Sequence, residues 1–319
     1  MSRRVRFAAS GMGSYWYEIG TMLQRALAGS GFELELETST SDHRNVRAVG
    51  RGDCAVGVTM PPFVDWANRR FGVLADADLA ELLVIAAINQ PVWLAAAIER
   101  AAGIGELREV AQRKYPWRPV MLPPDQLLGM YVDRLLALHE LSRDALREWG
   151  GGDLGPNLRS VDSDRPTTPR VMRPQTRQHA LSGRTDGFFL YTSWTVQWVR
   201  DLTSILELRF VGLEESALDV TIREFGGEKL ILPARLFPGA DADQPAIGWR
   251  HQYVYGTRDT EPDLVVAILR GLEDTADRLL LNAQGHSYTP IAPALVPGVA
   301  LHPAAAEYYD SRVRARLAS

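Results

Sequence analysis

Strand-like and helix-like segments alternate in the amino-terminal part of the chain, and this alternation constrains the fold more than any other feature. An apolar run at 5–9 has the length of a buried strand, residues 15–28 show helical spacing, and 32–37 alternate like a second strand. A short helix is expected at 45–49 and a third strand at 54–59. Because strands that alternate with helices at this spacing form parallel sheets with right-handed crossovers, the sequence predicts an α/β fold.

A second α/β series follows an apolar pair of segments, which we expect to be two buried strands at 82–88 and 92–97. The chain has 319 residues, enough for two cores of roughly 150 residues each, so we expect two lobes. Lobe 1 combines 1–92 with 246–319, and lobe 2 is 93–245. The later elements expected are helices near 104–114, 125–139, 142–149, 178–182 and 195–202, strands near 118–122, 188–191, 205–211 and 248–255, and a long helix that opens at 259–262.

Charge and cysteine content exclude several classes of function. Acidic and basic residues are mixed along the whole length, with a formal net charge of -4, so no field gathers polyanions and no nucleic-acid partner is expected. The single cysteine, Cys54, stands beside an apolar stretch and is expected to be a small buried hydrophobe. The six histidines show no metal-ligand spacing, and no motif for a cofactor is present, so we expect neither.

The location of the protein has two interpretations. The most apolar segment, 82–98, is interrupted by Asn89, Gln90 and Pro91, and its uninterrupted pieces are too short to cross a bilayer. Only four residues precede the first apolar run, so no secretory signal is recognised. The protein is periplasmic if a signal was removed, and cytoplasmic if Met1 is the native start.

The segment from Ser10 to Trp16 lies between a predicted strand and a predicted helix, as a dinucleotide fingerprint does. The third glycine is missing, and Trp16 stands where close packing needs the smallest residue, which argues against a Rossmann site. The unpaired backbone N–H groups of a helix amino terminus, with the hydroxyls of Ser10 and Ser14, can still bind a carboxylate. The alternative is a plain turn between strand and helix.

Hydroxyl-bearing residues follow two further strands of the predicted sheet. Thr38 to Ser41 come after the second strand, and Thr59 comes after the third. Ligands bind at the carboxyl ends of strands in open α/β sheets, so these residues are candidates for a binding site. Ser and Thr also cap helices without any functional role, and both interpretations stay open.

Aromatic side chains also gather near predicted strand ends, where they can line a pocket or belong to a core. Arg250 and His251 interrupt the apolar alternation of a late strand, so a buried cation there can face an anionic ligand, or the side chains can point to solvent. The aromatic residues are Tyr15, Trp16, Trp93, Tyr191, Trp194, Trp249 and Tyr253.

Several short motifs occur in order along the chain: Gly11 to Trp16, Glu35 to Asn45, Arg51 to Val58, Asp186 to Phe189, Phe237 to Gly239 with Asp241 to Pro245, and Leu301 to Pro303 with Tyr308 and Tyr309. Taken together, they resemble the solute-binding subunits of tripartite ATP-independent periplasmic (TRAP) transporters of the TAXI type. The similarity spans nearly the whole chain, and its specificity comes from order and spacing. Two departures stand out: Pro123 to Gln126 replace a turn rich in Gly, Ser and Thr, and 165–177 is unusually basic.

The resemblance implies a two-lobed type II periplasmic-binding-protein fold, in which each lobe is a mixed, mostly parallel sheet flanked by helices and crossing hinge strands join the lobes. It implies that the chain holds a small carboxylate, an amino acid or a dicarboxylate, in the cleft between the lobes and works with TRAP membrane permease subunits. The bulky aromatic residues expected around the cleft make an aromatic acid a further candidate ligand, and we expect a monomer. Carried over by position, the ligand groups are Ser10, Gly13, Ser14, Tyr15, Thr38, Ser39, Thr40, Thr59, Tyr191, Thr192, Ser193 and Trp194.

The leading hypothesis is therefore ligand capture by hinge closure, without covalent chemistry. A second hypothesis is a cytoplasmic decarboxylase or hydrolase on the same fold, suggested by His251 beside Arg250. A third is a cytoplasmic ligand sensor that presents its closed form to a protein partner.

Overall fold

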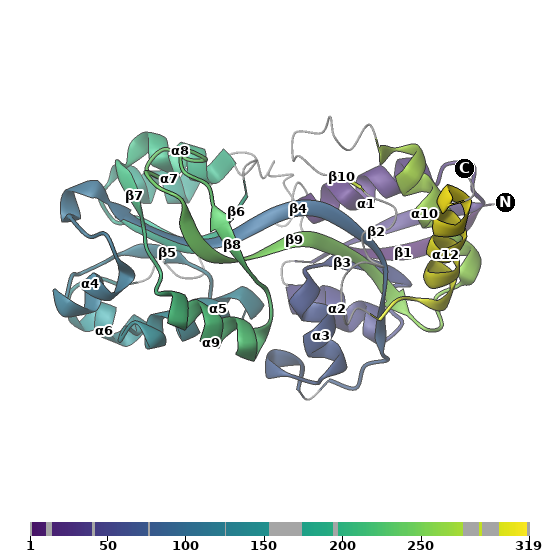
Figure 1. Cartoon of the computed structure of the whole chain (residues 1–319), viewed down its shortest axis with the longest axis horizontal. Coiled ribbons are helices and arrows are strands. Elements are labelled where there is room, and N and C mark those ends of the chain that lie inside the picture. The colour runs from purple at the N-terminus through teal and green to yellow at the C-terminus, as the bar shows by residue number, and fades with distance from the viewer. Residues whose placement is uncertain are drawn as a thin grey trace. The chain divides into compact units, whose positions relative to one another are not determined.

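The protein divides into two compact units (Figure 1). Unit 1 comprises Met1–Gln90 and Arg250–Ser319, and unit 2 comprises Pro91–Trp249. The boundaries expected from the sequence, at 92 and 245, and those of the structure fall in the same two strands, β4 (Leu82–Glu99) and β9 (Gln244–Thr257). The computed structural model describes residues 2–10, 15–39, 42–75, 77–124, 126–152, 174–193, 197–276, 287–288 and 300–317.

Unit 1 is a twisted sheet with the strand order β2-β1-β3-β9-β4. Strand β1 runs parallel to β2 and β3, whereas β9 is antiparallel to β3. The alternation predicted for this part of the chain is confirmed, and the sequence pattern missed helix α3. The elements are β1 (Arg3–Ser10), α1 (Tyr15–Ala26), β2 (Phe32–Ser39), α2 (Asp42–Gly50), β3 (Val56–Thr59), α3 (Pro61–Asn68) and the 3-10 helix η1 (Gly72–Leu74).

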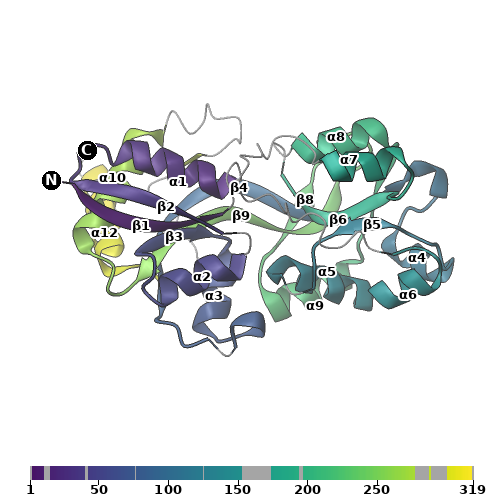
Figure 2. The ribbon, with the colours of Figure 1, turned by 180° about the vertical axis from the view of Figure 1, so that it is seen from behind.

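Helices cover both faces of the unit 1 sheet. Helix α10 (Pro262–Asp274) lies beside α1 on one face, and α2 and α3 lie on the other, as both views show (Figures 1 and 2). Helix α12 (Pro303–Leu317), which the sequence pattern also missed, packs on α10. The small residue Gly57 lets β3 approach α2, because a Cβ atom there would lie 3.1 Å from Val49.

Two long strands, β4 (Leu82–Glu99) and β9 (Gln244–Thr257), run from one unit into the other and neighbour each other in the sheet. The prediction of two strands at 82–88 and 92–97 is wrong, because β4 continues through Pro91. Proline lacks the N–H donor, but its fixed φ suits extended backbone, so the strand loses one donor and does not end there. The short strand β10 (Ser287–Tyr288) pairs with β4 in unit 1.

Unit 2 is built on the far halves of these two strands. Strand β6 is antiparallel to β4 and parallel to β5, β7 is antiparallel to β4, and β8 is antiparallel to β9. Helices α7 and α8 cover one face and α4, α5, α6 and α9 the other (Figures 1 and 2). Of these elements, β8 and α9 were not predicted. The bounds are η2 (Arg100–Ala102), α4 (Leu107–Gln112), β5 (Pro119–Met121), α5 (Leu127–Leu138), α6 (Arg143–Glu148), α7 (Pro174–Leu181), β6 (Gly187–Thr192), α8 (Gln197–Ile205), β7 (Leu208–Val211), α9 (Glu215–Phe225) and β8 (Glu228–Leu232).

An aromatic stack forms part of the core of unit 2. The rings of Phe210 and Phe237 are stacked with centroids 5.7 Å apart, and Phe188 meets Phe210 edge to face at 5.6 Å. All three side chains are buried. Within the described ranges, no helix is long and apolar enough to span a bilayer.

Helix α5 begins in very close contact with the loop that precedes it. A Cβ atom at Gly129 would lie 1.8 Å from the carbonyl oxygen of Pro123, which is far shorter than any contact between non-bonded heavy atoms. Glycine at this position therefore lets the first turn of α5 close against the end of β5.

We expect Gly129→Ala to lower the free energy of unfolding by about 1–3 kcal/mol, although alanine is the better helix former. Urea unfolding followed by circular dichroism measures the loss. The control is Gly105→Ala, where the nearest atom to the added Cβ is a flexible carboxylate oxygen of Glu109 at 3.5 Å. An equal loss in both variants would show that the contact with Pro123 is not the cause.

A buried histidine joins α5 to the amino end of α9. The side chain of His139 is fully buried; its Nδ1 lies 2.7 Å from the carbonyl oxygen of Leu135, and its Nε2 accepts the backbone N–H of Glu214 at 3.0 Å. Because Nε2 accepts, the ring is neutral and carries its proton on Nδ1. Burial lowers the pKa of His139 below its ordinary value of 6.5.

This lowered pKa makes stability depend on pH in a defined direction. The neutral ring contributes stability at neutral pH, and the contribution is lost as the pH falls below about 6.5, since the unfolded chain then binds a proton that the folded chain excludes. We expect a slope of up to about 1.4 kcal/mol per pH unit in urea unfolding between about pH 6.5 and 5. His139→Gln should be less stable at neutral pH and show a flatter slope; an unchanged slope would contradict the assignment.

Candidate functional site

The carboxyl ends of β1, β2 and β3 lie at one level of the unit 1 sheet. Ser10, the last residue of β1, pairs in register with Ser39, the last residue of β2. On the other side, Ala8 pairs with Gly57, so Thr59, two residues further along β3, lies level with Ser10. The structure thus brings three of the candidate residues to the sheet edge where open α/β proteins bind ligands.

Thr59 carries a buried hydroxyl at this edge. Its side chain is fully buried, and Oγ1 has no hydrogen-bond partner among the described residues. A buried hydroxyl without a partner costs about 1–3 kcal/mol, so Thr59 fits a position that a ligand completes. Thr38, by contrast, lies exposed on β2.

The indole of Trp16 orients an amide that sequence reasoning missed. Trp16 lies in the first turn of α1, is 3% exposed, and donates from Nε1 to Oε1 of Gln252 on β9 at 3.0 Å. Because an indole can only donate, this bond fixes which end of the amide faces it. The other end, Nε2 of the fully buried Gln252, has no partner in the part of the chain that the structure describes.

A second amide stands on the neighbouring strand. Gln90 is the last residue of unit 1 on β4, its side chain is fully buried, and neither Oε1 nor Nε2 finds a partner among the described atoms. The sequence marks each glutamine only as an uncharged polar residue in a mostly apolar strand, and this does not reveal whether the amide has a partner. Gln90 entered the prediction only as an interruption of the apolar segment 82–98, and His251 rather than its neighbour Gln252 was the candidate on the late strand.

Unit 2 presents polar groups at the end of β6. Thr192, the last residue of the strand, is fully buried with an unpartnered Oγ1 within the described structure, and Ser193 beside it is 2% exposed. Tyr191 is half-buried. The three predicted residues thus stand at the carboxyl end of a strand, as Thr59 does in unit 1.

Trp93 faces Thr192 across the β4–β6 ladder, and its contacts are internal to unit 2. Its Nε1 donates to the carbonyl oxygen of Ile231 at 2.9 Å, and its ring belongs to the hydrophobic cluster that includes Phe188. The indole of Trp93 is therefore part of the core of unit 2.

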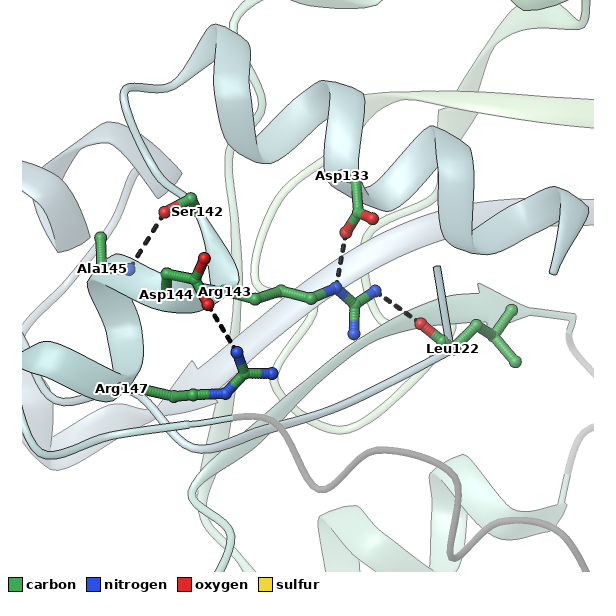
Figure 3. Close-up of polar contacts among 7 residues, drawn as sticks. All are labelled: Leu122, Asp133, Ser142, Arg143, Asp144, Ala145 and Arg147. Atoms are coloured by element: carbon green, nitrogen blue, oxygen red, sulfur yellow. Dashed lines mark hydrogen bonds and ion pairs between the residues drawn. The ribbon is translucent and has the colours of Figure 1, made fainter. Parts of the chain in front are cut away.

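The carboxyl end of β5 is held by a nearly buried arginine (Figure 3). Arg143 of α6, with 10% of its side chain exposed, donates from Nε to Asp133 of α5 and from a terminal nitrogen to the carbonyl oxygen of Leu122, both at 2.6 Å. Leu122 directly follows β5, so Arg143 ties the start of the Pro123 loop to two helices. The adjacent pair of Arg147 and Asp144 has the same 2.6 Å distance but lies exposed.

The two arginines provide a matched comparison. We expect Arg143→Lys to lower the free energy of unfolding by about 1.5–3 kcal/mol, because an ammonium cannot span two acceptors placed for a guanidinium. Arg147→Lys should change it by less than about 0.5 kcal/mol, since exposed pairs contribute little. Urea unfolding measures both, and similar losses would refute a special role for Arg143.

The remaining candidates differ in what the structure says of them. Arg250 is exposed and His251 half-buried, so the buried cation considered from the sequence is not found at Arg250. The reason is local: β9 is buried from Ala246 to Trp249 and again from Gln252 to Gly256, and Arg250 and His251 lie in the break between these two buried stretches. Gly13, Ser14, Thr40, Trp194 and residues 165–173 of the basic segment lie outside the described residues, as do the side chains of Ser10, Tyr15, Ser39 and 174–177.

A metal site or a reactive thiol would indicate chemistry other than reversible binding. Nowhere in the described structure do three or more His, Cys, Asp or Glu side chains gather in a way that could hold a metal ion. Burial raises the pKa of the Cys54 thiol to about 11, so the thiol is protonated at neutral pH.

No protein-family model and no curated protein matches the sequence. Solved structures do match in fold. MatC from Rhodopseudomonas palustris with bound malate aligns with a TM-score of 0.51 at 14% identity, and the alignment covers 98% of each chain. The periplasmic binding protein BugD aligns at 0.50 and 11% identity over 99% of this chain and 95% of its own. A protein described as a periplasmic transporter aligns at 0.50 and 10% identity over 98% and 93%.

At these identities the similarity shows the fold. The predicted fold class, that of two-lobed periplasmic binding proteins, is confirmed by these neighbours and by the strand order of the sheet. The TAXI subtype stays a prediction.

Proposed function

We propose that this chain is a solute-binding protein that captures a small organic acid and releases it unchanged. One observation carries the proposal: uncharged polar side chains, fully buried and each with a polar atom that has no partner in the described structure, stand at the carboxyl ends of β3 and β6 and on β9. They are Thr59, Thr192 and Gln252.

The energetics of these groups favour an anionic ligand with oxygen acceptors. The Nε2 of Gln252 can only donate, and the hydroxyls of Thr59 and Thr192 donate readily. A carboxylate accepts from such donors in charge-assisted hydrogen bonds, which are about twice as strong as neutral ones. Binding therefore supplies partners to groups whose burial is otherwise unfavourable.

The comparisons support the same class. The MatC structure has bound malate, and the other two similar structures are named as a periplasmic transporter and a periplasmic binding protein. Together with the TAXI-type motifs, these comparisons support a role as the extracytoplasmic receptor of a TRAP-type permease.

The test compares ligand binding with stability in two threonine variants of unit 1. In Thr59→Val the lost hydroxyl has no protein partner, so we expect an unchanged or higher melting temperature and a Kd for the acid that is weaker by about tenfold. In the control Thr260→Val the lost hydroxyl bonds the carbonyl oxygen of Ala55 at 3.0 Å and accepts the N–H of Thr257 at 2.9 Å. We expect this control to lose about 1–3 kcal/mol of stability and to keep its Kd.

Native mass spectrometry of the purified protein with a panel of organic acids identifies the ligand, and isothermal titration calorimetry gives its Kd. We expect one acid per chain, recovered unaltered when analysed by NMR after incubation. Conversion of the acid to a product would favour the enzyme hypothesis, and the absence of any bound acid would refute the proposal.

A further inference from the structure

The carboxamide of Gln90 is the feature that the proposed function leaves unexplained. It is fully buried, and both its acceptor Oε1 and its donor Nε2 lack partners among the described atoms. A carboxylate can satisfy Nε2, but it carries no proton to offer to Oε1, which can only accept. An acid without a second polar group would therefore leave this oxygen unpaired.

The strand around Gln90 gives no structural reason for an amide. From Leu82 to Ile88 every residue of β4 is apolar and buried, and an apolar side chain of similar size would fit the same strand. A buried amide that is left unpaired at both its acceptor and its donor is unfavourable for folding, and such local penalties are typical of functional positions.

The second group of the ligand must donate a hydrogen bond, and the surrounding charge decides its chemistry. An ammonium taken out of water needs an anionic partner, whereas a hydroxyl needs only an acceptor. The buried polar residues described in unit 1 include no Asp or Glu: they are Asn45, Thr59, Gln90, Gln252, Thr260, Thr275 and His302. The surroundings therefore favour a neutral donor over a cationic one.

We propose that Gln90 is a specificity-determining residue that selects acids with a hydroxyl next to the carboxylate, in preference to the unsubstituted acid and to the corresponding amino acid. Its Nε2 donates to a carboxylate oxygen, and its Oε1 accepts the proton of the neighbouring hydroxyl. Two adjacent groups of the ligand thus pair with the two ends of one amide. This inference rests on the function proposed above.

The test uses acids that differ only at one position: malate with succinate and aspartate, and mandelate with phenylacetate and phenylglycine, each chiral acid as separate enantiomers. Calorimetry with the wild-type protein should show one enantiomer of a hydroxy acid binding at least tenfold more tightly than both analogues. Gln90→Met and Gln90→Leu should reduce this preference to less than about threefold, because they weaken binding of the hydroxy acid more than binding of the unsubstituted acid. Their melting temperatures should equal or exceed that of the wild type, because an unpaired amide is removed.

The control Gln24→Met removes an amide of unit 1 that already has a partner, since its Nε2 donates to the carbonyl oxygen of Leu34 at 2.7 Å. It should keep the full preference for the hydroxyl. If the Gln90 variants weaken hydroxy and unsubstituted acids equally, or if they leave the preference intact, Gln90 does not recognise the hydroxyl and the inference is wrong. Equal or tighter wild-type binding of succinate, phenylacetate or the amino acids overturns the inference and leaves the proposed function standing, whereas failure of every acid to bind overturns both.

Discussion

Two strands, β4 and β9, belong to both units, and this sharing imposes the strictest requirement on the sequence. A strand that contributes to two cores must be apolar on both faces for almost its whole length, and β4 and β9 are buried along most of theirs. A polar side chain in the buried part of these strands is desolvated, so it loses its hydrogen bonds to bulk water and needs another partner. Gln90 and Gln252 are therefore the positions at which the sequence departs most from what folding alone would select.

The bond from Trp16 to Gln252 shows how the scaffold prepares such a position. The indole comes from the first turn of α1, and the amide comes from β9, far away in the sequence. One end of the amide is held, so its side chain stays ordered while the donor end remains available. At the end of β5, a side chain orients a backbone group in a similar way: Arg143 of α6 donates a hydrogen bond to the carbonyl oxygen of Leu122 and so fixes its position.

Much of the fold could be predicted because its signals are local. Helical spacing and strand alternation predicted β1 to β3 correctly. The hydroxyl residues that follow the strands correctly indicated that Thr59 lies level with the carboxyl ends of β1 and β2. The same logic failed at Pro91, where a residue that usually ends a strand lies inside one, and at α3, α9, β8 and α12, which had no clear pattern. Gln90 and Gln252 could not be selected from sequence, since whether a buried amide has a partner depends on the whole three-dimensional environment.

The state of Cys54 has a practical consequence. It is the only cysteine of the chain, it is buried, and its thiol stays protonated at neutral pH. Because maleimide and iodoacetamide dyes react with exposed thiolates, a cysteine introduced on the surface would be labelled far faster than Cys54. The natural chain can therefore accept an environment-sensitive fluorophore at a chosen place without first removing its own thiol, and a reporter of ligand capture can be built on the unmodified core.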